Sequence, residues 1–254
     1  MDLNYKVFGE GKAVIILHGL FGMLDNWKSF ARKLGESYKV YIIDQRDHGK
    51  SPHTNSFNYQ LLADDIKRFI DEHQIDLYAL IGHSMGGKAA MQFCADHPGD
   101  LEKLIAVDIG PNENPANHQT IFKALKAVPI EEISSRNEAE DVLSEYIQDQ
   151  GVRLFLMKNL TRSLKGNYKW KMNLDLLIEY YHEILAEVPF HYPMDTSSLF
   201  VRGLKSDYID QDNIDRIHEI FVNHEILDIE DAGHWVHADQ PDLLLDEVKT
   251  FLNN

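Results

Sequence analysis

The sequence predicts an α/β protein with a mostly parallel central sheet flanked by helices. Short, continuously apolar runs alternate with segments of helical periodicity, which is typical of parallel strands joined by helical crossovers. The expected strands are Lys12–Leu17, Val40–Ile43, Leu77–Ile81, Leu104–Val107, Leu199–Val201 and Glu225–Ile229. The expected helices between and after them are Asn26–Leu34, Tyr59–His73, Met85–His97, Asn213–Phe221 and Pro241–Leu252.

This alternation stops between residues 112 and 195, where only helical patterns occur. The helices expected there are Gln119–Val128, Glu131–Ser135, Glu138–Gln150, Val152–Leu160 and Leu174–Ala186. We therefore expect a core domain made of residues 1–111 and 196–254, and an inserted helical cap or lid made of residues 112–195. Below, "the insert" means residues 112–195.

The composition limits the class of partner. The 254 residues carry 25 Lys and Arg against 41 Asp and Glu, a net charge of −16, which disfavours nucleic acids and anionic membranes as partners. No apolar run approaches the roughly 18 residues of a membrane span, and no signal peptide is visible. The single cysteine, Cys94, excludes an internal disulfide. We expect a cytoplasmic monomer or small homo-oligomer that acts on a small molecule.

A candidate nucleophile lies between the third expected strand and the helix after it. The segment Gly82-His83-Ser84-Met85-Gly86 is a G-x-S-x-G motif, and its strand–turn–helix context is that of a nucleophile elbow. The turn has to be sharp for the Ser84 hydroxyl to project above the sheet, and glycines two positions away on either side leave room for it. Ser84 is therefore the expected nucleophile.

A serine hydroxyl needs a base, and His234 is the best placed of the 13 histidines. It follows the last expected strand, so it should lie at the same edge of the sheet as Ser84. His237 is the main alternative. Two backbone N–H groups, of Leu20 after the first strand and of Met85 after the nucleophile, are the expected donors to the oxyanion of the reacting acyl group.

Together these motifs resemble the α/β-hydrolase family. The resemblance rests on His18-Gly19, the loop Asp44–Ser51, the elbow at Ser84 and the segment Gly233–Trp235, and it covers the expected core domain. Within the family, the sequence looks most like the small YbfF-type bacterial esterases. The resemblance implies the α/β-hydrolase fold, with the insert as the family's lid over the active site. The expected reaction of a serine esterase needs neither metal nor cofactor.

The triad acid departs from the commoner family pattern. Ser206 stands after the strand Leu199–Val201 where the family usually has its aspartate, and Asp207 follows it. The other candidate is Asp108, which ends the strand Leu104–Val107. The resemblance to the YbfF-type esterases implies Asp108 as the acid and the Ser206 hydroxyl as an auxiliary partner. Asp207 stays open as the alternative, and Asp108 could also serve only to cap the turn that follows it.

These residues favour a serine esterase that hydrolyses small to medium acyl esters through an acyl-enzyme on Ser84. The alternatives on the same fold are a C–C hydrolase, a lyase, a cofactor-free perhydrolase or a non-catalytic ligand receptor. Candidate substrate-binding residues are Phe155, Met157, Trp170 and Trp235.

One charge pattern could indicate the leaving group. Residues 151–173 contain no acid but six bases, namely Arg153, Lys158, Arg162, Lys165, Lys169 and Lys171. They could bind the phosphates of an acyl-CoA thioester, although a solvated basic face is the more ordinary interpretation.

Overall fold

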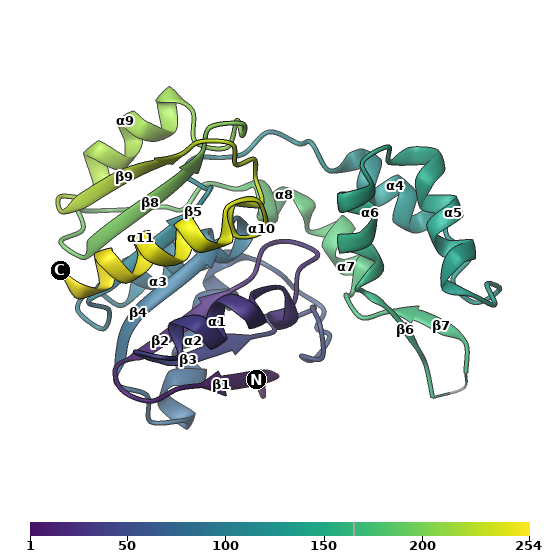
Figure 1. Ribbon diagram of the computed structural model, residues 1–254, viewed down its shortest axis with the longest axis horizontal. Coiled ribbons are helices and arrows are strands. Elements are labelled where there is room, and N and C mark those ends of the chain that lie inside the picture. The colour runs from purple at the N-terminus through teal and green to yellow at the C-terminus, as the bar shows by residue number, and fades with distance from the viewer. Residues whose placement is uncertain (165) are drawn as a thin grey trace.

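The computed structural model describes residues 1–164 and 166–254, and in this part of the chain seven strands form one sheet (Figure 1). In spatial order they are β1 (Tyr5–Phe8), β3 (Lys39–Ile43), β2 (Ala13–Leu17), β4 (Leu77–His83), β5 (Lys103–Val107), β8 (Ser197–Gly203) and β9 (His224–Ile229). Only β1 runs antiparallel to its neighbour within this sheet. The predicted mostly parallel sheet is confirmed, and β1 is an addition to it.

Both faces of the sheet are covered, as the unbroken apolar runs predict. In β2, Ile15 and Leu17 belong to one buried cluster, whereas Val14 and Ile16 belong to the other, because successive side chains of a strand point to opposite faces. The first cluster includes α2 (Tyr59–Glu72), α3 (Met85–Asp96) and α9 (Gln211–Ile220). The second includes the 3₁₀ turn η1 (Leu24–Trp27), α1 (Lys28–Leu34), α10 (Val236–Asp239) and α11 (Pro241–Asn253).

Between β5 and β8 the chain leaves the sheet and forms a group of short elements to one side of it, coloured teal to green in Figure 1. They are α4 (Gln119–Ala127), α5 (Arg136–Tyr146), α6 (Gln150–Met157), β6 (Leu160–Arg162), β7 (Tyr168–Trp170), α7 (Leu174–Glu179) and α8 (Tyr181–Leu185).

The expectation that this stretch contains only helices is wrong. Strands β6 and β7 pair as an antiparallel hairpin. The expected helix Glu131–Ser135 is a turn, because Ser135 is extended and caps α5 by accepting a hydrogen bond from the Glu138 N–H. The expected helix Leu174–Ala186 is divided at Tyr180 into α7 and α8.

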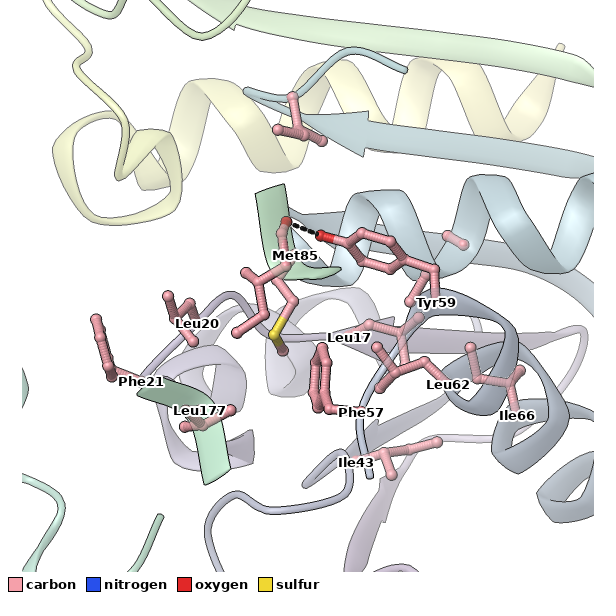
Figure 2. Close-up of a cluster of buried hydrophobic side chains, with 14 of the residues drawn as sticks. Leu17, Leu20, Phe21, Ile43, Phe57, Tyr59, Leu62, Ile66, Met85 and Leu177 are labelled. Atoms are coloured by element: carbon pink, nitrogen blue, oxygen red, sulfur yellow. Dashed lines mark hydrogen bonds between the residues drawn. The ribbon is translucent and has the colours of Figure 1, made fainter. Parts of the chain in front are cut away.

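The insert packs on the core through apolar side chains. Figure 2 shows Leu177 of α7 in one cluster with Phe21, Phe57 and Met85. The hydrophobic core is therefore continuous from the sheet into the insert. Within the described residues, no helix is both long and apolar enough to cross a bilayer.

Candidate active site

Ser84 lies on a strained turn between β4 and α3. Its backbone has φ +51° and ψ −122°, a conformation that is costly for a residue with a side chain. A Cβ at Gly82 would lie 2.2 Å from the Gly86 carbonyl oxygen, and a Cβ at Gly86 would lie 2.5 Å from that of Leu17. The two glycines of the motif are therefore required by close backbone approach, and the turn they permit presents the Ser84 side chain to a pocket.

His234 and Asp108 meet at the carboxyl edge of the sheet. His234 Nδ1 lies 2.8 Å from Asp108 Oδ2, although 126 residues separate them. The Asp108 side chain is fully buried, and it also accepts hydrogen bonds from the Ser206 hydroxyl and from the Gly203 N–H, the latter at 3.0 Å. These donors stabilise a carboxylate that would otherwise be costly to bury.

The alternative residues lie elsewhere. Asp207 is exposed, and among the described residues it has no hydrogen-bond or ion-pair partner. His237 is half-buried and stacks on Trp27 with ring centroids 4.4 Å apart. Burial lowers the pKa of His237 to about 3, so this ring stays neutral. Neither residue lines the pocket that contains Ser84 and His234.

Two residues that the sequence analysis did not single out hold His234. The Tyr208 ring stacks on the imidazole, with centroids 3.9 Å apart and planes 15° apart. His83 Nε2 lies 2.7 Å from the His234 carbonyl oxygen, so this nitrogen carries the proton and donates it to the bond. Burial keeps the pKa of His83 well below its ordinary value. The position of His83 inside the G-x-S-x-G motif was a usable signal, whereas Tyr208 had none.

The backbone N–H groups of Leu20 and Met85 are the expected oxyanion donors. Both residues line a small cavity of about 20 Å³ with Ser84. In residues 1–164 and 166–254, neither N–H donates a hydrogen bond to a protein acceptor. Two donors without protein partners beside a serine hydroxyl are able to bind an oxyanion.

Neutral imidazoles fix the loop that carries Leu20. The Phe21 N–H donates to His48 Nε2 at 3.3 Å, and the Gln45 N–H donates to His18 Nε2 at 3.0 Å. Burial lowers the pKa of His18 to about 4 and that of His48 to about 3. Both rings are therefore uncharged at neutral pH, which leaves each Nε2 free to accept.

The pocket above Ser84 has a volume of about 220 Å³. Its wall is mostly apolar and is formed by Leu20, Phe21, Ile121, Val152, Phe155 and Trp235. Asn117, His118 and Tyr208 form a polar end. The Phe155 and Trp235 rings lie 5.6 Å apart, so these two expected substrate-binding residues do line the pocket.

The other two expected substrate-binding residues do not line this pocket. Met157, at the end of α6, is buried in the hydrophobic core. Trp170, in β7, lines a separate cavity of about 280 Å³. Neither residue thus lies at the pocket of Ser84, because an apolar side chain in this part of the chain can equally well pack inside the insert.

Three cations of the basic segment have partners within the insert. Arg153 pairs with Glu140 at 2.9 Å, Arg162 lies over the ring of Tyr168, and the Lys171 ammonium donates to the Lys158 carbonyl oxygen at 2.7 Å. Lys165 lies outside the described residues. Three of the cations thus have neighbours of their own inside the insert, which gives no support to a common phosphate site.

Comparisons with known proteins agree with this architecture. A family model described as alpha/beta hydrolase fold matches residues 12–130. The chain is 36% identical to the sn-1-specific diacylglycerol lipase ABHD11 of Danio rerio, with 99% of this chain and 83% of that protein covered. It is 34% identical to esterase YbfF of Escherichia coli (strain K12), with 95% and 93% covered. A solved structure of a marine microorganism esterase superposes with a TM-score of 0.96 at 40% identity, with 98% and 99% covered. The chain therefore belongs to the α/β-hydrolase family, as a hydrolase of the esterase and lipase type.

Proposed function

We propose that this protein is a serine esterase that hydrolyses small to medium acyl esters through an acyl-enzyme on Ser84. One observation carries the proposal: His234, whose Nδ1 lies 2.8 Å from the buried Asp108 carboxylate, lines the same pocket as Ser84. A carboxylate on Nδ1 fixes the tautomer in which Nε2 is free to accept a proton.

The proposed reaction has two steps. Ser84 Oγ attacks the acyl carbonyl carbon, and His234 Nε2 takes the hydroxyl proton and returns it to the leaving alcohol. A water molecule then attacks the acyl-enzyme with His234 again as base, and this releases the carboxylic acid and restores Ser84. Asp108 orients the imidazole and stabilises its charged form, while the Leu20 and Met85 N–H groups bind the oxyanion of each tetrahedral intermediate.

We further propose that residues 112–195 act as a lid that sets the acyl specificity. The insert contributes Ile121, Val152 and Phe155 to the apolar wall, facing Phe21 and Trp235 of the core. The pocket volume of about 220 Å³ is matched to a short or medium acyl chain. The names of the two curated relatives, an esterase and a diacylglycerol lipase, agree with an oxygen ester as substrate.

Oxygen esters are the proposed substrates in preference to acyl-CoA thioesters. The acyl-CoA hypothesis requires basic side chains that are free to bind phosphates, but Arg153 and Lys171 are engaged within the insert. Equal sensitivity of an ester and an acyl-CoA of the same acyl length to added salt would support this preference. A KM that rises with salt for the acyl-CoA alone would reverse it.

Two measurements test the proposal. A fluorophosphonate should label the wild-type protein at Ser84 within minutes, and the Ser84→Ala variant should not be labelled. A panel of p-nitrophenyl esters with graded acyl chains should be hydrolysed, with kcat/KM rising and then falling as the chain exceeds the pocket. Absence of labelling would indicate a ligand receptor. Labelling without ester hydrolysis would indicate a lyase, a C–C hydrolase or a perhydrolase.

A further inference from the structure

Lys88 is a buried cation that the proposed reaction does not use. It lies in the first turn of α3, where its N–H donates to the Ser84 carbonyl oxygen at 3.1 Å, and it is 0% exposed. Its ammonium donates three hydrogen bonds, to the carbonyl oxygens of Asn112 at 2.7 Å, Leu185 at 3.0 Å and Ala186 at 2.6 Å. All three donors of the ammonium are thus satisfied by backbone groups.

These carbonyls belong to the two chain segments that connect the insert to the core. Asn112 begins the insert, and Leu185 and Ala186 end its last helix, α8. The two connecting segments also pair with each other: the Asn114 N–H donates to the Leu185 carbonyl at 2.9 Å, and the Val188 N–H donates to the Pro111 carbonyl at 2.8 Å. Lys88 therefore joins the first residue of the insert and the end of its last helix to the helix that begins at the nucleophile.

The choice of a lysine here is informative because burial of an ammonium is costly. Burial lowers the pKa of Lys88 to about 7, while Glu113 and Glu187 act in the opposite direction. An apolar side chain would fill the same space without that cost. Among the described residues, however, the carbonyls of Asn112 and Ala186 have no other hydrogen-bond donor. The lysine satisfies these carbonyls at the point where the insert leaves and rejoins the core.

The same segments form the back of the active site. The small cavity behind Ser84 is lined by Asn114, Ile184 and Leu185, and Asn117 and His118 follow directly into the pocket. Tyr59 of α2 provides a second hydrogen bond between the core and the end of the insert's last helix. Its hydroxyl donates to the Ile184 carbonyl oxygen at 2.6 Å, which is the dashed line in Figure 2. A shift of these segments would move the insert relative to the nucleophile.

We propose that Lys88 is a positioning residue that clamps both ends of the insert to the nucleophile helix and so fixes the acyl-binding wall over Ser84. The kinetic part of this inference rests on the proposed esterase function, whereas the clamp itself does not. Lys88 does not line the pocket above Ser84, so its loss should affect long acyl chains, which reach the insert, more than an acetyl group, which stays near Ser84.

The test compares wild-type protein with Lys88→Met, which is unbranched and one heavy atom shorter than lysine and removes the three donors. The KM for the best long-chain p-nitrophenyl ester should rise about tenfold, the equivalent of about 1.4 kcal/mol, with kcat for the acetate ester within about threefold of wild type. Hydrogen exchange at the amides of Asn114 and Val188 should accelerate about tenfold, whereas exchange in β4 should not change.

Lys103→Met is the matched control. Lys103 is also buried, and its ammonium donates to the Phe251 carbonyl oxygen at 2.7 Å, but it begins β5 at the edge of the sheet opposite Asp108. This variant should leave the KM for the long-chain ester at its wild-type value. Hydrogen exchange at the amides of Asn114 and Val188 should also stay unchanged. If Lys88→Met does not fold, Lys88→Gln, which keeps two N–H donors on a shorter side chain, should show the same changes at a smaller size.

The outcomes separate the two proposals. Unchanged exchange at Asn114 and Val188, or equal kinetic effects on acetyl and long-chain esters, would overturn the role of Lys88. A wild-type protein that resists fluorophosphonate would instead overturn the esterase function, and the exchange measurement would still decide whether the clamp exists.

Discussion

Replacement of Asp108 by asparagine gives the sharpest test of the proposed triad. The carboxylate accepts from His234 Nδ1, from the Ser206 hydroxyl and from the Gly203 N–H. In Asp108→Asn the amide oxygen can keep the Gly203 bond, because it stays an acceptor. The amide NH₂ then faces His234 Nδ1, which has to become an acceptor, so the imidazole proton moves to Nε2.

The expected loss follows from this change of tautomer. With the proton on Nε2, that nitrogen has no lone pair to accept the Ser84 proton, and the imidazolium also loses its counter-charge. We expect kcat for p-nitrophenyl esters to fall by about 10⁴-fold, or about 5 kcal/mol of transition-state stabilisation. KM should change little, because Asp108 is fully buried and does not line the pocket.

Asp207→Asn is the matched control, since it makes the same chemical change one residue after Ser206. Its side chain is exposed, so its kcat should stay within about twofold of wild type. Both variants should show wild-type circular dichroism before their kinetics are compared. A larger loss in Asp207→Asn than in Asp108→Asn would refute the assignment and make Asp207 the triad acid.

Two further predictions concern the pocket wall and the buried histidines. Phe155→Ala should enlarge the pocket beside Trp235 and move the best acyl chain on the p-nitrophenyl panel to a longer one; an unchanged preference would remove Phe155 from the acyl site. Folding lowers the pKa from 6.5 to about 4 for His18 and to about 3 for His48 and His237. The unfolded chain therefore binds more protons than the folded protein below pH 6.5. The free energy of unfolding in urea should therefore fall between pH 7 and pH 5, by up to about 2 kcal/mol for each histidine, and His237→Phe should reduce this fall. Equal free energies of unfolding at both pH values would contradict it.

The sheet could be predicted because burial on both faces leaves a clear local signal. Each residue of β2 is buried, so its five apolar residues appear in the sequence without interruption. β1 lacks that signal, since its residues alternate between exposed and half-buried and it is only four residues long. Its pairing with β3 is a tertiary contact that no short pattern predicts.

The insert was harder to predict because several of its elements are decided by a single residue or contact. The hairpin β6–β7 contributes three residues per strand, too few to show a period of two. Ser135 lies in a segment of helical composition, but its side chain caps the next helix. Met157 and Trp170 are apolar in the same way as Phe155, and only the packing shows which of them faces Ser84.

Ser84, Asp108 and His234 could be nominated because each follows a parallel strand, and such strands end at one edge of the sheet. Lys88 carries no comparable signal. It lies four residues after Ser84 on a helix, where a lysine would ordinarily indicate a solvated face. Its partners are backbone carbonyls 24, 97 and 98 residues away, and a carbonyl has no residue type by which a sequence could reveal it. Catalytic groups are thus recognisable by their chemistry, whereas a residue that positions them through the backbone becomes visible only once the chain is folded.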